Sequence, residues 1–334
     1  MQIKENVIIA RISTGLANQM YEIAASYALA RELNRELILD ISSCCFSAWG
    51  YLGDYFNIPS FQKMICVKNV NIQQSHTNPD RMPPGIKSQV SIWLETEQEN
   101  YIHYKKLEEA SGLESDGPIY LCGYFFDRHM YYEKYWADIK QLFTLKEDIR
   151  EIRQFKKLIN GKVSVGVHIR RGDMLFADWA IAMKDDYYRA AVEYCRSQYG
   201  DCIFCVFSDD IDYAKQLLGQ DSSIYYVHFN GYDDVALIEF ICLSLCNHRI
   251  LSNSSTFSRL ADELNEYKEG HFFVQATAKG KTEFKNHVKR YINETIKKLP
   301  KKRRIIIDKY DIARYARRYK ADGTSNIERF EGNA

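Results

Sequence analysis

The sequence has little proline and glycine and no tract of low complexity. Its 334 residues include 6 prolines and 17 glycines, without an internal repeat or a Ser/Gly-rich linker. Disorder is therefore excluded for most of the chain, and any junction between domains must be short. Hydrophobic residues make up 46% of the sequence, enough for two ordinary domains with a core each.

A long hydrophobic run is also missing from the start of the chain. The first apolar run begins at Val7 and stops at Arg11, far short of the roughly 20 apolar residues that a membrane helix needs. We therefore expect neither a secretory signal nor a membrane span, and a cytoplasmic location.

Cysteines occur in an odd number and without the spacing of a metal site. Most of the nine lie inside apolar stretches such as CIFCVF and FICLSLC, where a free thiol behaves as a small hydrophobic group. Cys202 and Cys205 form one C-x-x-C, but no second pair has zinc spacing. The segment predicts a buried strand, and we expect no metal ion.

The formal net charge of +1 conceals a basic segment near the end of the chain. Between Lys285 and Lys320 fourteen Lys and Arg residues face three acidic ones, a local net of +11 that leaves −10 on the remainder. The stretch KKLPKKRR could attract anionic lipid headgroups, which would allow peripheral contact with a membrane. A solvated helix surface is the alternative, and we do not expect a nucleic acid partner.

Hydrophobic periodicity predicts an α/β fold in two domains and a tail. The first half begins with a strand at Asn6–Ile12, a glycine loop and a helix, followed by a weakly patterned region from about 42 to 117 and a helix over about 127–143. This half is expected to form an N-terminal α/β domain over residues 1–155.

The second half is more regular, because short apolar strands alternate with helices from Val163 onward. This pattern predicts a parallel sheet covered on both faces, a Rossmann-like domain over 156–284. A basic helix and tail over 285–334 would follow. Right-handed crossovers place the carboxyl ends of all strands at one edge, where ligands of such sheets bind.

Three polar signatures follow strands of this second domain: HIRRGD, FSDD and LSNSSTFS. Arg170 and Arg171 offer planar forks of donors that match phosphate oxygens. The hydroxyls of Ser254, Ser255 and Thr256 and the backbone N–H groups of a helix start would add donors for an anion. Asp209 or Asp210 could accept from a base or a ribose, and together these groups predict a pocket for a nucleoside diphosphate.

Two motif matches have simpler interpretations. The tripeptide Arg171-Gly172-Asp173 would serve cell adhesion only on a flexible extracellular loop, and nothing in the sequence indicates one. Asp210 and Asp212 form a D-x-D, a spacing by which some enzymes bind manganese. Here the pair opens a helix, where acidic residues cap and complement the helix dipole.

The order and spacing of four blocks resemble those of α-1,2-fucosyltransferases of glycosyltransferase family 11: GLANQM at Gly15–Met20, HIRRGDML at His168–Leu175, FSDD at Phe207–Asp210 and NSSTFS at Asn253–Ser258. The similarity spans roughly residues 5 to 280. HIRRGD is shared with α-1,6- and protein O-fucosyltransferases, whereas its combination with GLANQM is more specific to this family.

The resemblance implies an α/β fold of GT-B type, with two Rossmann-like domains and a donor-binding cleft between them. It also implies GDP-fucose as the donor substrate, inversion at the anomeric carbon, and neither a cofactor nor a metal ion. The acceptor would be a galactoside-containing oligosaccharide or lipid-linked glycan, fucosylated on its 2-hydroxyl during synthesis of a bacterial-type surface polysaccharide such as O-antigen or capsule.

The family pattern also implies a role for each matched residue. Arg170 would be catalytic at the β-phosphate, with Arg171 supporting the motif, His168 and Asp209 or Asp210 near the guanosine, and Ser254, Ser255 and Thr256 at the diphosphate. Asn18, beside Gly15 in the glycine loop, would be the second catalytic residue and approach the pyrophosphate or the acceptor from across the cleft. Asp173 would hold the arginine loop.

This sequence departs from the family in its last block, and some roles stay open. Arg259 and Leu260 stand where paired tryptophans are usual. No general base is assigned, since neither Glu22 nor Asp127 has a spacing argument behind it. Trp49, Tyr51, Tyr55 and Trp93 are candidates for stacking on the acceptor sugar.

Two alternative functions remain beside α-1,2 transfer. One keeps the donor but changes the linkage, as in α-1,6 transfer, and the GLANQM block disfavours it. The other is a non-catalytic nucleotide- or glycan-binding protein, which the joint presence of Arg170, Arg171, Asp209 and Asn18 disfavours.

Overall fold

The computed structural model describes eleven stretches of the chain. They are residues 3–44, 50–59, 62–64, 84–113, 117–175, 182–229, 235–253, 255–267, 269–275, 304–307 and 330–331. The chain divides into two compact units, Met1–Glu147 and Asp148–Ala334. The expected limits, 1–155, 156–284 and 285–334, differ from this division mainly in the placement of helix α5 (Arg150–Ile159), which packs against α8 (Val235–Leu245) of the second unit.

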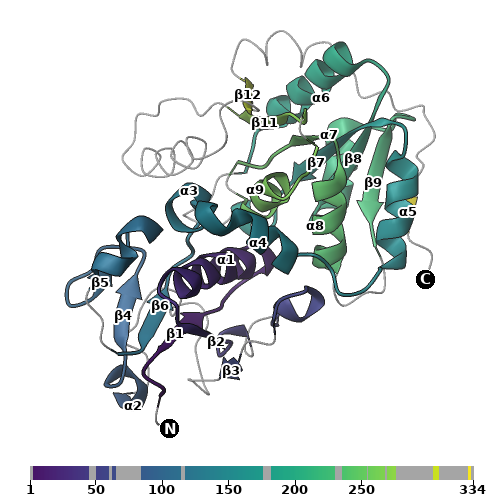
Figure 1. The fold of residues 1–334 in the computed structure, drawn as a ribbon. Helices are drawn as coiled ribbons and strands as arrows, with labels where there is room; N and C mark the ends of the chain where they lie inside the picture. The colour runs from purple at the N-terminus through teal and green to yellow at the C-terminus, as the bar shows by residue number, and fades with distance from the viewer. Residues whose placement is uncertain are drawn as a thin grey trace, which may run out of the picture. The chain divides into compact units, whose positions relative to one another are not determined.

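The first unit is built on a six-stranded parallel sheet in the order β3-β2-β1-β6-β4-β5 (Figure 1). Its strands are β1 (Val7–Arg11), β2 (Glu36–Asp40), β3 (Gln62–Met64), β4 (Ser91–Leu94), β5 (Ile102–His103) and β6 (Ile119–Cys122). Helix α1 (Leu16–Glu32) packs on β1 and β2 and buries most of its side chains, small and apolar ones together with Gln19 and Glu22. The expected strand, glycine loop and helix at the start of the chain are confirmed.

Shorter elements complete the first unit. They are α2 (Pro84–Lys87), α3 (Arg128–Tyr131), α4 (Trp136–Leu142) and the 3-10 turns η2 (Gly53–Tyr55), η5 (Leu107–Gly112) and η6 (Glu133–Tyr135). The single helix expected over about 127–143 is therefore wrong in detail, because α3 ends at Tyr131 and the chain turns through η6 before α4 begins.

The second unit contains a seven-stranded sheet in the order β12-β11-β10-β7-β8-β9-β13, and every pairing in it is parallel. Its strands are β7 (Val163–Ile169), β8 (Cys202–Ser208), β9 (Ile224–His228), β10 (His248–Ile250), β11 (Phe272–Gln275), β12 (Arg304–Ile307) and β13 (Phe330–Glu331). The regular alternation predicted from Val163 onward is confirmed.

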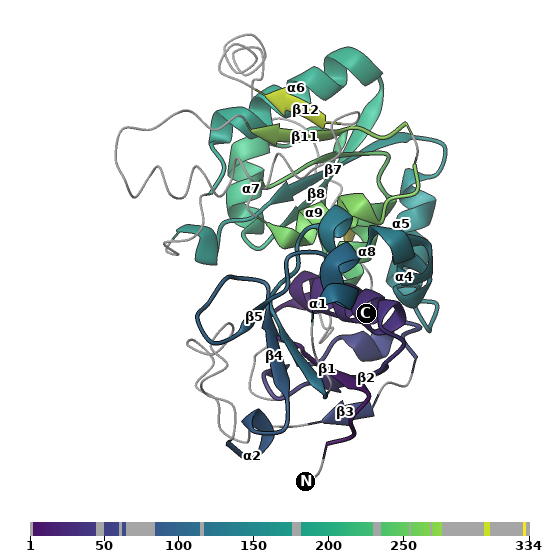
Figure 2. The same cartoon turned by 60° about the vertical axis from the view of Figure 1, so that its left-hand side comes forward.

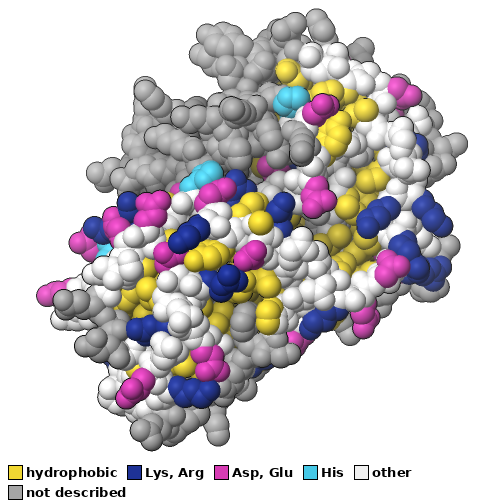
Figure 3. Space-filling model, in the orientation of Figure 1, with side chains coloured by type: hydrophobic (Ala, Val, Ile, Leu, Met, Phe, Trp, Pro, Cys, Tyr) yellow, Lys and Arg dark blue, Asp and Glu magenta, His cyan; other side chains and the backbone are white. Residues whose placement is uncertain are grey.

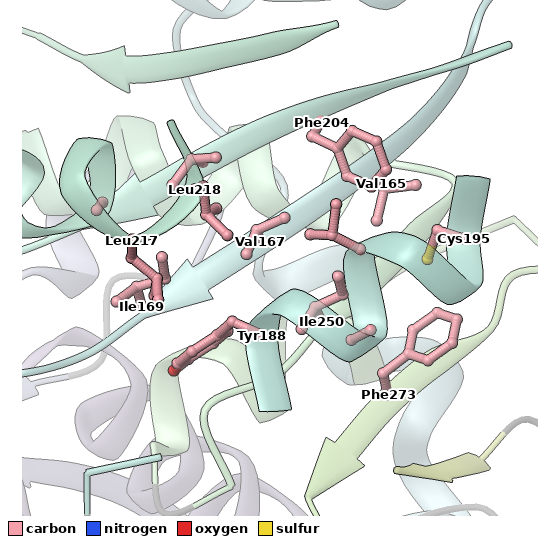
Figure 4. Close-up of a cluster of buried hydrophobic side chains, with 14 of the residues drawn as sticks. Val165, Val167, Ile169, Tyr188, Cys195, Phe204, Leu217, Leu218, Ile250 and Phe273 are labelled. Atoms are coloured by element: carbon pink, nitrogen blue, oxygen red, sulfur yellow. The ribbon is translucent and has the colours of Figure 1, made fainter. Parts of the chain in front are cut away.

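Helices cover both faces of this sheet (Figure 2). Val165, Val167 and Ile169 of β7 join one core with residues of α6 (Asp185–Tyr199) and α7 (Ile211–Leu218), as Figure 4 shows. Alternate residues of β7 point to the opposite face, where α8 and α9 (Thr256–Glu263) pack. Both layers are needed, because a parallel strand exposes its apolar residues on both sides.

Part of the expected basic tail is a strand and not a helix. Arg304–Ile307 pair with Phe272–Gln275, and Phe330 and Glu331 pair with β9 at the other edge of the sheet. The run of three isoleucines after Arg304 explains the difference, because β-branched residues favour strands. The remainder of 285–334, with most of KKLPKKRR, lies outside the described residues.

The described surface is mixed in charge and polarity. On the face drawn in Figure 3, basic and acidic side chains are interspersed over the described residues, with small groups of hydrophobic side chains between them. Among the described residues, no helix is both long enough and apolar enough to cross a bilayer.

Candidate functional site

Strands β7 and β8 bring two of the polar signatures together at the carboxyl edge of the second sheet. The strands pair in parallel over their whole length, and Ile169 lies opposite Ser208 at their ends. Arg170 and Asp209, the next residue of each strand, therefore leave the sheet side by side. This confirms that HIRRGD and FSDD meet at one edge.

Asp209 holds the arginine loop with both of its oxygens. Its Oδ2 lies 3.0 Å from Nη1 of Arg170, and its Oδ1 accepts a hydrogen bond of 2.8 Å from the backbone N–H of Arg171. The Arg170 side chain remains about one quarter exposed. Asp209 therefore fills the supporting role that the sequence analysis gave to Asp173, whose side chain lies outside the described residues.

Position 172 has no room for a side chain, because the Asp209 carboxylate lies close to it. A Cβ atom at position 172 would lie 2.5 Å from Oδ2 of Asp209, well inside van der Waals contact. The carboxylate cannot retreat without releasing Arg170. The glycine of the RRGD sequence thus serves the internal geometry of the loop.

Arg171 packs as a support beside the loop. Its guanidinium carbon lies 3.6 Å from the centroid of the Tyr213 ring, and its Nε lies 3.9 Å from Oδ2 of Asp210. Tyr213 in turn donates a hydrogen bond to Asp185. A guanidinium over an aromatic face is favourable, particularly where water is excluded.

Asp210 caps helix α7. Its Oδ1 accepts a hydrogen bond of 3.0 Å from the backbone N–H of Tyr213, three residues further on. Asp212 lies in the first turn, and its side chain is 91% exposed. The D-x-D therefore has the geometry of a capped helix start.

His168, the last but one residue of β7, is buried as a neutral ring. Burial and then the nearby charge of Arg170 lower its pKa to about 3. The ring stacks on Phe257 of α9 at 5.1 Å between centroids, and no described residue bonds to its buried Nδ1. A group that stays unprotonated to such low pH is suited to binding and packing rather than to proton transfer.

The third signature emerges next to the arginine loop, because β10 pairs with β7. Ser255 is buried and precedes helix α9, its backbone N–H donates to the Ser252 carbonyl at 2.9 Å, and Thr256 is the first helical residue. The Ser255 side chain makes no capping hydrogen bond to α9. Ser254 lies outside the described residues.

Arg259 and Leu260, which depart from the family pattern after this block, are interior residues. Arg259 and Leu260 are both buried in the second unit, 4% and 1% exposed. Nε of Arg259 lies 3.5 Å from Oε1 of Glu263 one turn later. Both side chains therefore belong to the interior of the second unit.

Glu239 is a residue that the sequence analysis missed. It lies near the beginning of α8, hence at the carboxyl edge, and it is partly buried. Burial, followed by the charge of Asp209, raises its pKa to about 8. The sequence does contain one indication of it, because Glu239 is the one charged residue in the otherwise apolar segment Val235–Leu245.

In the first unit, the GLANQM block follows the carboxyl end of β1, with Gly15 before α1 and residues 16–20 in its first turns. Thr14 has a φ of +61°, and Asn18 Nδ2 donates to its hydroxyl at 2.7 Å. The buried Oδ1 of Asn18 has no partner among the described residues. Gly15 caps α1, and a Cβ built there meets no described atom within 4 Å.

The other candidates in this unit have structural roles. Glu22 is buried and accepts from the backbone and the hydroxyl of Ser13 at 2.6 and 2.7 Å, and burial raises its pKa. Asp127 caps α3. Trp93 is fully buried, so stacking on a sugar there is excluded, whereas Tyr51 and Tyr55 are at least partly exposed and Trp49 lies outside the described residues.

A sequence profile described as Glycosyl transferase family 11 matches residues 57–291. An O-antigen biosynthesis glycosyltransferase, WbnK of Escherichia coli, is 28% identical over 77% of this chain and 90% of its own length. An alpha-1,2-colitosyltransferase of the same organism is 25% identical over 79% and 90%, and the bovine galactoside alpha-(1,2)-fucosyltransferase 2 is 26% identical over 71% and 63%.

One solved structure, the fucosyltransferase NodZ from Bradyrhizobium, shares the fold with a TM-score of 0.50 at 19% identity, over 78% of this chain and 94% of that one. The likeness, together with the two parallel sheets, confirms the expected α/β architecture of GT-B type with two Rossmann-like units.

Proposed function

Since the chain belongs to glycosyl transferase family 11, we propose that it transfers L-fucose from GDP-fucose to the 2-hydroxyl of a galactoside, with inversion at the anomeric carbon. Its class as a glycosyltransferase follows from that membership. The observation that carries the donor assignment is the arginine loop, in which Asp209 fixes Arg170 at 3.0 Å at the carboxyl edge of a parallel sheet. Turnover of GDP-fucose in the presence of lactose tests the proposal.

The proposed reaction forms one bond and breaks one. The acceptor oxygen attacks C1 of fucose while the bond from C1 to the β-phosphate oxygen breaks, its electron pair leaves with GDP, and the hydroxyl proton is lost to solvent or a base. Negative charge therefore builds up on the β-phosphate. Arg170 would stabilise that charge, and because Asp209 already orients the guanidinium, little reorganisation is needed during reaction.

The rest of the donor would be bound by groups around this loop. The hydroxyls of Ser255 and Thr256 and the backbone N–H groups at the start of α9 offer donors to the diphosphate. His168 would lie near the guanosine. Gly15 and Asn18 of the first unit are proposed to contact the pyrophosphate or the acceptor. The unpaired Oδ1 of Asn18 suits the acceptor, because an amide oxygen accepts a hydrogen bond from a sugar hydroxyl.

Glu239 is our candidate for reading the guanine base. A carboxylate can accept two hydrogen bonds from the neighbouring N–H groups of a guanine edge, which uracil and adenine do not offer. With a pKa of about 8, Glu239 is mostly protonated at pH 7 in the free protein. Binding of guanine would therefore require loss of this proton.

This requirement predicts a pH dependence of donor affinity. Between pH 7 and 8.5 the ionised fraction of a group with a pKa of about 8 rises about eightfold, so the affinity for GDP should rise by a similar factor. Calorimetry with GDP measures it, with UDP as the control nucleotide. Glu239→Gln should remove the increase, and an unchanged pH dependence in that variant would exclude Glu239 as the base-reading group.

Transfer is proposed to need no metal ion. The carboxylate of Asp210 is already bonded to the Tyr213 backbone and lies near Arg171, which supports a structural role for the D-x-D. We expect full turnover of GDP-fucose in excess EDTA, measured as GDP released. Loss of turnover that Mn²⁺ restores would contradict this expectation.

One relative suggests GDP-colitose as an alternative donor. A relative 25% identical to this chain is named an alpha-1,2-colitosyltransferase, and colitose is fucose without its 3-hydroxyl. Comparison of kcat/KM for GDP-fucose and GDP-colitose decides between the two sugars. We keep fucose as the proposal, because the family blocks match fucosyltransferases.

The biological setting is proposed from the same relatives. WbnK is named an O-antigen biosynthesis glycosyltransferase, which supports a lipid-linked glycan acceptor in surface-polysaccharide synthesis. A cytoplasmic enzyme that touches the inner leaflet through its basic segment would meet such an acceptor. Replacement of Lys301, Lys302 and Arg303 by Gln should therefore reduce the fraction of protein that sediments with anionic liposomes. An unchanged fraction would contradict the membrane contact.

A further inference from the structure

The carboxyl edge of the first sheet carries a second polar and aromatic group beside the GLANQM loop. Strands β4 and β6 end together, with Leu94 opposite Cys122 and the backbone N–H of Glu95 donating to the Cys122 carbonyl at 3.1 Å. Glu95 and the segment that begins at Gly123 therefore leave the sheet side by side. Ligands of parallel sheets bind at such an edge.

The segment after β6 is held in an uncommon conformation. Phe125 has a φ of +54°, and its buried ring packs against Tyr104 and Tyr131 at 6.0 and 5.1 Å. A Cβ at Gly123 would lie 2.5 Å from Cβ of Glu95. Strain of this kind persists where the surroundings impose it, and it is concentrated at ligand sites.

This conformation places two aromatic rings next to each other at the surface. Tyr124 and Phe126, on either side of the anchored Phe125, are partly exposed and stack at 5.1 Å with an interplanar angle of 14°. Phe126 also meets Tyr21 of α1 edge-on at 5.3 Å. The pair thus lies against α1, the helix that begins with the GLANQM block, within the same unit.

Glu95 is the carboxylate of this edge with an oxygen available to a ligand. Its Oε2 accepts from the backbone N–H groups of Tyr124 and Phe125 at 2.8 and 3.0 Å, and no described residue donates to its Oε1. The side chain is partly exposed. The other carboxylates nearby are engaged: Asp40 by Ser42 and Tyr120, Glu22 by Ser13, and Asp127 at the start of α3.

We propose that Glu95 and Tyr124 form the subsite for the acceptor galactose, an assignment that rests on the proposed function. The C–H groups at positions 3, 4 and 5 of galactose form one apolar face, which suits the ring of Tyr124. The free oxygen of Glu95 accepts from a sugar hydroxyl, a charge-assisted hydrogen bond. The backbone N–H of Tyr124 bonds to Glu95 and the Tyr124 ring stacks on Phe126, so the ring and the carboxylate are held at the same edge.

Two substitutions test the subsite by the KM for lactose. Glu95→Gln keeps an oxygen for the two backbone N–H groups but replaces the accepting oxygen by a donor, and Tyr124→Ala removes the ring. Each should raise the KM for lactose at least about tenfold, equivalent to about 1.4 kcal/mol. Tyr124→Phe should stay within about threefold of wild type, and Tyr267→Ala, at an exposed tyrosine of the other unit, should have no effect.

Two further readouts separate this proposal from the proposed function. Hydrolysis of GDP-fucose without an acceptor, and the affinity for GDP, should be unchanged in both variants, and a thermal melt should show that the first unit is folded. Saturation-transfer NMR on the wild-type protein with lactose should mark galactose protons 3, 4 and 5 most strongly. A wild-type KM for lactose in Glu95→Gln and Tyr124→Ala would overturn the subsite and leave fucosyl transfer standing, whereas wild-type protein that binds GDP but neither binds nor fucosylates lactose would overturn both.

Discussion

Replacement of Arg170 by alanine is expected to lower turnover of GDP-fucose by about 100-fold or more, the loss typical of removing one donor aimed at developing charge. Arg170→Lys should not restore wild-type turnover, because lysine keeps the charge but lacks the planar fork that Asp209 holds at 3.0 Å. Initial rates of GDP release with lactose as acceptor measure both effects.

The control for this result is Arg153→Ala. Arg153 forms an exposed ion pair of 3.1 Å with Asp148 in the same unit, and such pairs contribute little to stability. Turnover should therefore stay at the wild-type level. Retention of more than about a third of wild-type activity by a folded Arg170→Ala protein would contradict the assignment of Arg170 to the leaving phosphate.

Gly172→Ala is expected to weaken GDP binding about tenfold or more, without removing any side chain that touches the donor. The added Cβ would lie 2.5 Å from Oδ2 of Asp209, and overpacking of this kind costs about 1–3 kcal/mol. Because both oxygens of Asp209 are bonded to the arginine loop, the carboxylate cannot move without displacing Arg170. Calorimetry with GDP and a thermal melt measure the change.

Gly112→Ala is the matched control, since a Cβ at that position meets no described atom within 4 Å. It should leave the affinity for GDP unchanged. If Gly172→Ala also binds GDP within about twofold of wild type, the loop tolerates a shifted Asp209, and the clamp described above does not determine donor binding.

The donor side of this enzyme could be predicted because its signals are local. Residues 202–207 form a continuous apolar run that ends directly in polar residues, and Val163–Ile169, which is mostly apolar, ends in the same way. Strand ends in a parallel sheet share an edge, so the meeting of the HIRRGD and FSDD segments followed from the pattern alone. The partner of each side chain did not follow, since the sequence assigned Asp173 to the loop and Asp209 or Asp210 to the guanosine, whereas Asp209 bonds to the loop.

The proposed acceptor side was harder to predict from the sequence, because its strands are short and lie in a weakly patterned region. β4 has four residues and β5 has two, too few for an alternation to be recognised. Trp93 was offered as a sugar-stacking residue but is a core residue of β4, whereas Tyr124 and Glu95 follow strands whose register is set only by tertiary packing. The positive φ of Phe125 has no sequence signal, since phenylalanine rarely adopts it.

The linkage of the product formed from GDP-fucose and lactose tests the central claim most directly. We expect NMR to show an α-anomeric fucose whose H1 correlates through the glycosidic oxygen with C2 of galactose. Attachment at any other oxygen, a β-anomeric fucose, or release of GDP without a glycoside product would contradict the proposal that this enzyme is an inverting transferase acting on the 2-hydroxyl of a galactoside.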